Sequence, residues 1–213
     1  MKSGFFIFLS FIALVFLTVP SNVVAQSAVQ GPKEVVAAAS SEFISVMEKN
    51  ISQKEKKAEL GWLVDQYFDL VEMGRRSLGP VFKRIGEKER SRFLDLFPKA
   101  FSKTNDFVKK IFDFQDEKIR IIKEETKDNV AVVYTNVIGS RMKDDGVSVN
   151  YRLILKDGKW KIYDILIEDI NWSCILSYKD EFSIGERIRG DSISGLLAYL
   201  EEKINKEEQS LSN

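Results

Sequence analysis

The chain has 213 residues, and 44% of them are hydrophobic, which is enough for one domain with a sizeable core. Its 32 basic and 32 acidic residues balance and are interspersed, so the charge gives no indication of a nucleic-acid partner. The sequence has no histidine and a single cysteine. This excludes Ser-His-Asp and Cys-His catalysis, histidine-ligated zinc and an intramolecular disulfide.

The N-terminus is typical of an export signal. Lys2 precedes an uncharged apolar run over residues 5–19, and small residues end at Ala25, before an expected cleavage site at Gln26. The run is shorter than the roughly 20 residues that a membrane-spanning helix needs. A retained membrane anchor is the alternative to a cleaved signal peptide. We therefore expect residues 1–25 to be a signal peptide, residues 26–213 to form a single domain, and the protein to be periplasmic.

Helical spacing of apolar residues begins after this leader. Residues 34–47 and 53–68 each carry an apolar stripe, and Ser52 is the expected N-cap of the second segment. Asp69 is the expected N-cap of a short helix over residues 70–78. These segments predict three helices in succession.

A longer helix rich in phenylalanine is predicted from Glu87 to about Phe112. Pro98 lies inside it and should kink or split it, because proline removes a backbone donor and clashes with the preceding turn. The rings on this helix exceed what one contact between a helix and a sheet requires. They fit either an ordinary core or a ligand pocket; they are Phe93, Phe97, Phe101 and Phe107.

The period of the pattern then changes from helical spacing to alternation, which predicts strands. The last two strands flank Asp157 and Gly158, a strong signal for a tight hairpin. Helices return near residue 177 and at Ile193. The four strands predicted in this way cover residues 118–122, 129–138, 147–155 and 160–167.

These elements predict an α+β fold: a helical layer on one face of a four-stranded antiparallel sheet, with an apolar pocket between them. The last strand is apolar on both faces and needs cover on both. The residues expected to line the pocket are Phe68, Val71, Leu78, Phe93, Phe97, Phe101, Val108, Val149, Tyr151, Leu153, Tyr163, Ile165 and Ile167.

Asp164 is the one acidic residue inside an apolar strand. It fits a general base in a cone-shaped pocket, or a structural residue paired with an arginine or a backbone amide, and we assign it to structure. Cys174 has apolar neighbours and is expected to be buried. We expect no catalytic residue, no metal site and no cofactor.

Three segments together resemble the MlaC, or toluene-tolerance, family. The first is Tyr67-Phe68-Asp69-Leu70-Val71-Glu72-Met73-Gly74-Arg75-Arg76-Ser77-Leu78-Gly79, with Arg90 to Phe97 after it. The second is Trp160-Lys161-Ile162-Tyr163-Asp164, similar to a Trp-Lys-Val-Tyr-Asp strand of the family. The third is Tyr178-Lys179-Asp180-Glu181-Phe182, followed by the segment from Ile193 to Leu200.

The resemblance implies a periplasmic, non-enzymatic carrier whose cargo is phospholipid, and we expect the protein to be a monomer. Such a carrier shuttles lipid between an inner-membrane ABC transporter with an MCE-domain ring and an outer-membrane lipoprotein–porin complex, and so maintains outer-membrane lipid asymmetry. A related branch is associated with hopanoid lipids, which makes a hopanoid the alternative cargo. Two other classes stay open: a small isomerase or hydrolase that uses Asp164, and a periplasmic adaptor that binds only proteins.

Overall fold

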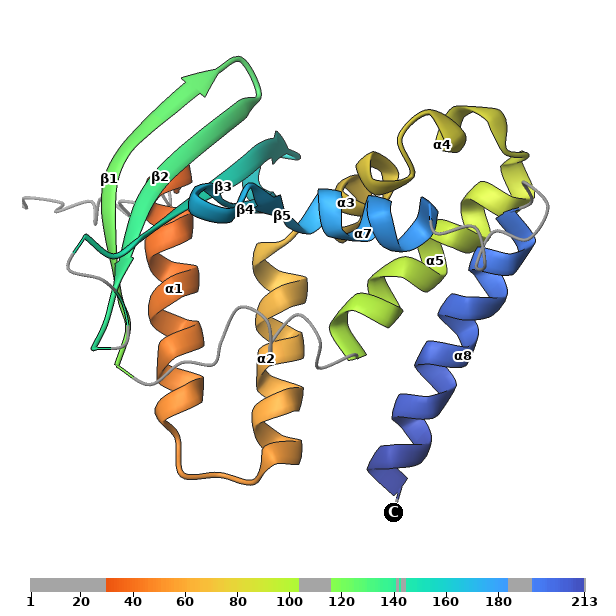
Figure 1. The fold of residues 1–213 in the computed structure, drawn as a ribbon, viewed down its shortest axis with the longest axis horizontal. Helices are drawn as coiled ribbons and strands as arrows, with labels where there is room; N and C mark the ends of the chain where they lie inside the picture. Colours follow the sequence, from red (N-terminus) through yellow and green to blue (C-terminus); the bar gives the residue numbers. More distant parts are fainter. Residues whose placement is uncertain (1–29, 104–115, 141, 143–144, 184–192, 213) are drawn as a thin grey trace, which may run out of the picture.

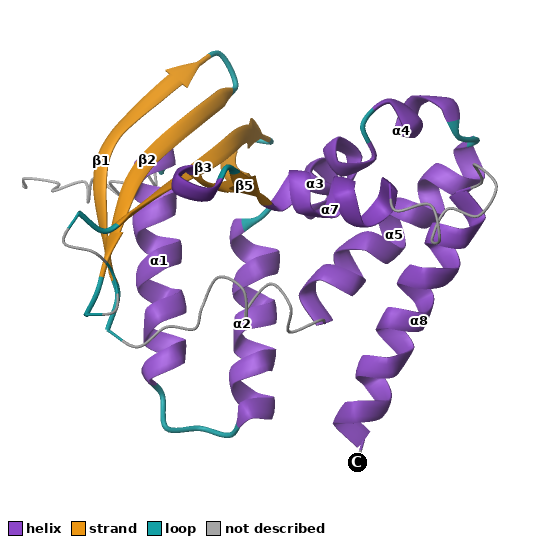
Figure 2. Ribbon diagram, viewed as in Figure 1, coloured by secondary structure: helices purple, strands orange, loops and turns teal. Residues whose placement is uncertain are grey.

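The structure is a computed structural model that describes residues 30–103, 116–140, 142, 145–183 and 193–212 (Figure 1). The expected signal peptide, Phe107 and Val108 lie outside these residues. In the described part, one group of helices lies on one side of a twisted antiparallel sheet, and a second group of helices lies beside the sheet (Figure 2). The predicted α+β class is confirmed.

Helices α1 (Pro32–Glu48) and α2 (Gln53–Tyr67) run side by side and are joined by a short connection (Figure 1). Ser52 caps α2 as predicted. Its hydroxyl accepts from the amide of Glu55, whose carboxylate in turn accepts from the amide of Ser52. This reciprocal box satisfies two amides that the helix itself leaves without partners.

Helix α3 (Leu70–Leu78) begins at its predicted N-cap, since Asp69 accepts a hydrogen bond from the amide of Glu72. It ends at Gly79, whose φ of +55° favours glycine, and Pro80 opens α4 (Pro80–Arg84).

Helix α5 (Glu87–Lys103) runs through Pro98 without a break, so of the two expected effects, a kink or a split, the split does not occur. Residues 104–112 of the predicted helix lie outside the described residues. A proline inside a helix costs about 3 kcal/mol. Burial of Phe93, Phe97 and Phe101 on one face of α5 offsets this, because each such side chain contributes about 1.5–3 kcal/mol.

The sheet has five strands in the order β1-β2-β3-β4-β5, all antiparallel, one more than the sequence predicted. The fifth, Trp172–Ser173, is too short to show an alternating pattern. The Asp157–Gly158 hairpin is confirmed, with φ of +51° and +74°. The other strands are β1 (Lys118–Lys127), β2 (Val130–Ile138), β3 (Val147–Lys156) and β4 (Lys159–Ile167).

The first strand is longer than the predicted 118–122. Its second half is charged and exposed at the edge of the sheet, so it lacks the alternation by which strands are recognised. A short 3-10 turn (η1, Glu168–Ile170) follows β4 and leads into β5.

The last two helices complete the second group. Helix α7 (Cys174–Ser183) packs on α3, and α8 (Ile193–Ser212) packs along α5 (Figure 1). Helix α1 contacts β1, β2 and β4, so it covers one face of the sheet. A single apolar core runs through both groups, and Cys174 is buried in it as predicted.

Candidate functional site

Aromatic rings from α5 and α7 form one cluster between the two helices. On α5, Phe93, Phe97 and Phe101 recur every four residues and lie on one face, as do Tyr178 and Phe182 on α7. The rings of Phe97 and Tyr178 meet edge to face with their centroids 5.2 Å apart, and those of Phe93 and Phe182 at 5.9 Å. We call these five residues the aromatic cluster.

The cluster is closed on a third side by α3, which approaches at Gly74. A Cβ atom on Gly74 would lie 2.7 Å from Cδ1 of Phe97 and 3.2 Å from Cε1 of Phe93. Only glycine lets α3 come this close without displacing a ring. Phe93 and Phe97 are 0% and 1% exposed.

Phe68 connects the aromatic cluster to the sheet. Its ring centroid lies 6.4 Å from that of Phe43 on α1 and 6.4 Å from that of Phe101 on α5. Its backbone forms a parallel bridge with Ile162 of β4, beside a hydrogen bond of 2.8 Å from the amide of Asp69 to the carbonyl of Ile162. The apolar layer is therefore continuous from α5 to the sheet.

The face of the sheet that α1 covers is also apolar. Tyr151 of β3 is opposite Ile165 of β4, and Leu153 is opposite Ile162, so these residues share one face. Burial raises the pKa of Tyr151 to about 12. Its phenol would be neutral at physiological pH even at the ordinary pKa of about 10. This face therefore carries no charge at Tyr151.

The structure thus places most of the expected lining residues in two connected regions. Phe93, Phe97 and Phe101 belong to the aromatic cluster, and Phe68 links it to the sheet. Leu78 is buried at the end of α3, and Ile167 is half-buried opposite Val149. The sheet region holds Val149, Tyr151, Leu153, Ile165 and Ile167.

Two expected residues lie elsewhere. Val71 is on the outer side of α3 and is 40% exposed. Tyr163 lies at a bulge in β4, between Ile162, which pairs with Leu153, and Asp164, which pairs with Arg152. The guanidinium of Arg76 lies 4.3 Å from the centroid of its ring. Strict alternation along β4 fails at this bulge, which the sequence does not reveal.

A charged group adjoins Tyr163. Glu72 accepts hydrogen bonds from Arg75 and Arg76, each at 2.6 Å. Burial opposes ionisation of Glu72, but the bonds from the two arginines outweigh it and hold its pKa below the usual value. Arg76 therefore joins α3 to β4, a role that sequence reasoning assigned to neither arginine.

Asp164 has both kinds of partner that a structural role requires. It is 1% exposed and accepts a hydrogen bond of 3.1 Å from the amide of Ile175, at the start of α7. Arg152 lies 3.4 Å away on β3. Burial raises the pKa of Asp164, although these partners oppose the rise. The carboxyl group anchors the helix that carries Tyr178 and Phe182.

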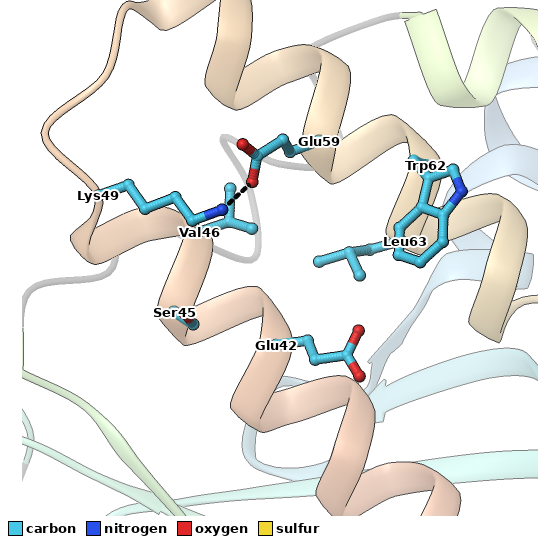
Figure 3. A pocket seen from close by; sticks show the side chains of 7 residues that line it. All are labelled: Glu42, Ser45, Val46, Lys49, Glu59, Trp62 and Leu63. Carbon is cyan, nitrogen blue, oxygen red and sulfur yellow. Dashed lines mark hydrogen bonds and ion pairs between the residues drawn. The ribbon is translucent and has the colours of Figure 1, made fainter.

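The described residues also leave a hollow of about 420 Å³ between α1 and α2 (Figure 3). None of the expected lining residues is on its wall. Its lining consists of Glu42, Ser45, Val46, Lys49, Glu59, Trp62 and Leu63.

Sequence reasoning missed Tyr178 and Phe182 of the aromatic cluster. The four-residue spacing of the two rings on a predicted helix was the available signal.

Within the described ranges, no group of three His, Cys, Asp or Glu side chains is placed to hold a metal ion. No helix in those ranges is both long and apolar enough to cross a membrane.

Comparison with known proteins identifies the family. The model of the MlaC protein family matches residues 37–202, from within α1 to within α8. The chain belongs to the MlaC family. The family match therefore spans the aromatic cluster, the sheet and the hollow between α1 and α2.

The fold of this chain is also similar to that of a solved structure. It is a phospholipid-binding protein from Ralstonia solanacearum, solved in complex with a phospholipid. The TM-score is 0.64 at 17% sequence identity, and the match covers 84% of this chain and 99% of the other. No curated protein sequence matches the chain.

Proposed function

We propose that this MlaC-family protein is a periplasmic lipid carrier. It binds a phospholipid by its acyl chains in the apolar layer between the aromatic cluster and the sheet, and shuttles it between complexes of the inner and outer membranes. The observation that carries the proposal is the continuity of this layer, from Phe97 through Phe68 to Tyr151, in a fold matched over 99% of a chain solved with a phospholipid.

The chemistry of the layer suits acyl chains. Its described core side chains are aromatic and aliphatic, and the phenol of Tyr151 is neutral at physiological pH. Ring and aliphatic contacts can be exchanged for contacts with methylene groups at little net cost, since both partners are apolar. Each methylene removed from water contributes about 0.8 kcal/mol, so two acyl chains supply ample affinity without a specific polar contact.

Carriage of this kind needs no bond chemistry, and we propose no catalytic residue and no cofactor. It does require that a partner open the site, because a tightly held apolar cargo does not leave spontaneously for water. We propose an ABC transporter with an MCE-domain ring as the inner-membrane partner, and a lipoprotein–porin complex at the outer membrane. Outer-membrane lipid asymmetry is the process this transport would serve.

Native mass spectrometry with lipid extraction tests the cargo directly. The protein would be purified from the periplasmic fraction without detergent. We expect a bound mass that resolves on extraction into a diacyl phospholipid. A hopanoid mass would keep the carrier and replace the cargo. A protein without lipid that also takes none from phospholipid vesicles would contradict the proposal and favour an adaptor that binds only proteins.

A further inference from the structure

The hollow between α1 and α2 is lined by apolar side chains and by charged side chains at two places that lie apart from each other. Val46 of α1 and Leu63 of α2 are buried in its floor. Lys49 and Glu59 form an ion pair of 2.5 Å near the connection between the helices (Figure 3). Glu42 lies two turns farther along α1, about 10 Å from Lys49 along the helix axis, and its side chain extends toward α2 (Figure 3).

Glu42 differs from the other carboxylate of the hollow because no cation pairs with it in the described part of the chain. Glu59 is neutralised by Lys49, whereas Glu42 accepts a hydrogen bond of 2.7 Å from the hydroxyl of Tyr67. Burial, and then the bond to Glu42, raises the pKa of Tyr67 to about 12. A phenol is protonated at physiological pH even at its ordinary pKa of about 10, so this hydroxyl can donate to Glu42 there. Glu42 is half-buried and keeps lone pairs for a second donor.

The hollow also has an exposed indole on its rim. Trp62 is 61% exposed, and among the described residues it is the only aromatic side chain in the group of large exposed hydrophobics. A tryptophan face attracts a guanidinium group, and exposed tryptophans beside an apolar depression are common at the centres of protein interfaces.

We infer that this hollow is a docking site for an arginine side chain of a partner protein. The aliphatic stem would lie on Val46 and Leu63, and the guanidinium would donate to Glu42 beside the face of Trp62. Arginine suits both contacts, because its planar fork binds a carboxylate and stacks on an indole. The inference deepens the proposed function, since a carrier must dock on the complexes that load and unload it.

An acyl chain fits the same hollow poorly. It would remove water from the half-buried carboxylate of Glu42 and give no hydrogen bond in return, which costs free energy. The apolar layer between α5 and the sheet carries no such penalty. The charge at Glu42 therefore favours a cationic occupant over lipid.

The test is an NMR titration of the nitrogen-15-labelled protein with a short acetylated and amidated peptide, Gly-Leu-Arg-Leu-Gly. The control peptide has citrulline, a neutral isostere, in place of arginine. We expect the arginine peptide to shift the indole N–H of Trp62 and backbone amides of α1 and α2. The citrulline peptide should bind roughly three- to tenfold more weakly.

Two matched variants separate charge from folding. Glu42→Gln keeps an acceptor for Tyr67 but removes the charge, and should weaken the arginine peptide by a similar factor. Glu48→Gln removes an exposed charge from the end of α1, outside the lining of the hollow, and should leave binding unchanged. Equal effects of the two variants would overturn the inference.

Three other results of these titrations would each overturn the inference that the hollow docks an arginine side chain. Equal binding of both peptides would show that the hollow does not recognise charge. Shifts at α1 and α2 with a soluble short-chain phospholipid, but not with peptide, would make the hollow a lipid subsite. Shifts on concentrating the protein alone would assign it to a second copy. Native mass spectrometry can still show bound lipid when the peptide fails, so this inference and the proposed function fail separately.

Discussion

At the scale of single residues, Gly74 is the point where α3 packs directly against the aromatic cluster. Alanine at this position favours the helix by about 1 kcal/mol, but its Cβ would lie 2.7 Å from the ring of Phe97, and overpacking costs about 1–3 kcal/mol. The net effect of these two contributions is a loss, and we expect Gly74→Ala to lower the free energy of unfolding by up to about 2 kcal/mol, measured by urea denaturation.

Gly61 of α2 provides the control for this substitution. A Cβ there would meet no atom closer than 3.8 Å, so Gly61→Ala gains helix propensity without a clash. It should raise the free energy of unfolding by about 0.5–1 kcal/mol. If both alanines stabilise the protein equally, α3 does not approach the cluster as described.

Asp164 gives a prediction about pH. Its pKa is raised from 3.8 in the folded protein, so the folded state binds the proton more tightly than the unfolded chain does. The contribution of this group is greatest below pH 3.8 and is lost as the pH rises through the raised pKa. Asp164→Asn should remove that decline and leave the protein at least as stable at pH 7, measured by denaturation at several pH values.

Asp164→Ala is the contrasting variant. It deprives the half-buried amide of Ile175 of its acceptor, which costs about 1–3 kcal/mol, whereas asparagine retains one. If Asp164→Asn destabilises the protein as much as alanine at pH 7, the carboxylate charge is required. That result would return Asp164 to the list of candidate functional groups.

At the scale of elements, helix ends and tight turns were the most predictable features. Ser52, Asp69 and the Asp157–Gly158 turn depend on hydrogen bonds and dihedral preferences within a few residues, and all three are confirmed. The unbroken α5 and the two-residue β5 depend on distant packing instead. Local pattern cannot show that burial of three rings outweighs the cost of Pro98.

The cap of α2 can be tested by itself. Ser52→Ala removes the acceptor for the amide of Glu55, and should lower the free energy of unfolding by about 1 kcal/mol. Ser41→Ala, at an exposed position inside α1, should be neutral or slightly stabilising. Thermal or urea denaturation measures both, and equal effects would mean that the capping box contributes nothing.

The candidate site was predictable only in part, for a related reason. Helical spacing identifies the rings of α5, but the residues that meet them on α7 lie about 80 positions later in the chain. Alternation identifies Tyr151 and Leu153, yet it misplaces Tyr163 because one bulge shifts the pattern. The sequence predicts which side of a helix or strand is apolar, whereas which two apolar sides pack together depends on the whole fold.

At the scale of the whole molecule, we propose separate tasks for the buried apolar layer and for the hollow at the surface. The apolar layer from the aromatic cluster to the sheet would hold the cargo, and the hollow between α1 and α2 would dock a partner. Phe68 lies where the two regions approach, directly after α2 and in contact with Phe101. A partner that moves α2 would therefore disturb the layer in which we propose that lipid binds.

The central claim is that phospholipid acyl chains lie between the aromatic cluster and the sheet. Photo-cross-linking with a phospholipid that carries a diazirine near the end of one acyl chain, followed by peptide mapping, tests it most directly. We predict adducts on α5, α7, β3 and β4. Adducts confined to the hollow between α1 and α2, or no adduct after incubation with labelled vesicles, would contradict it.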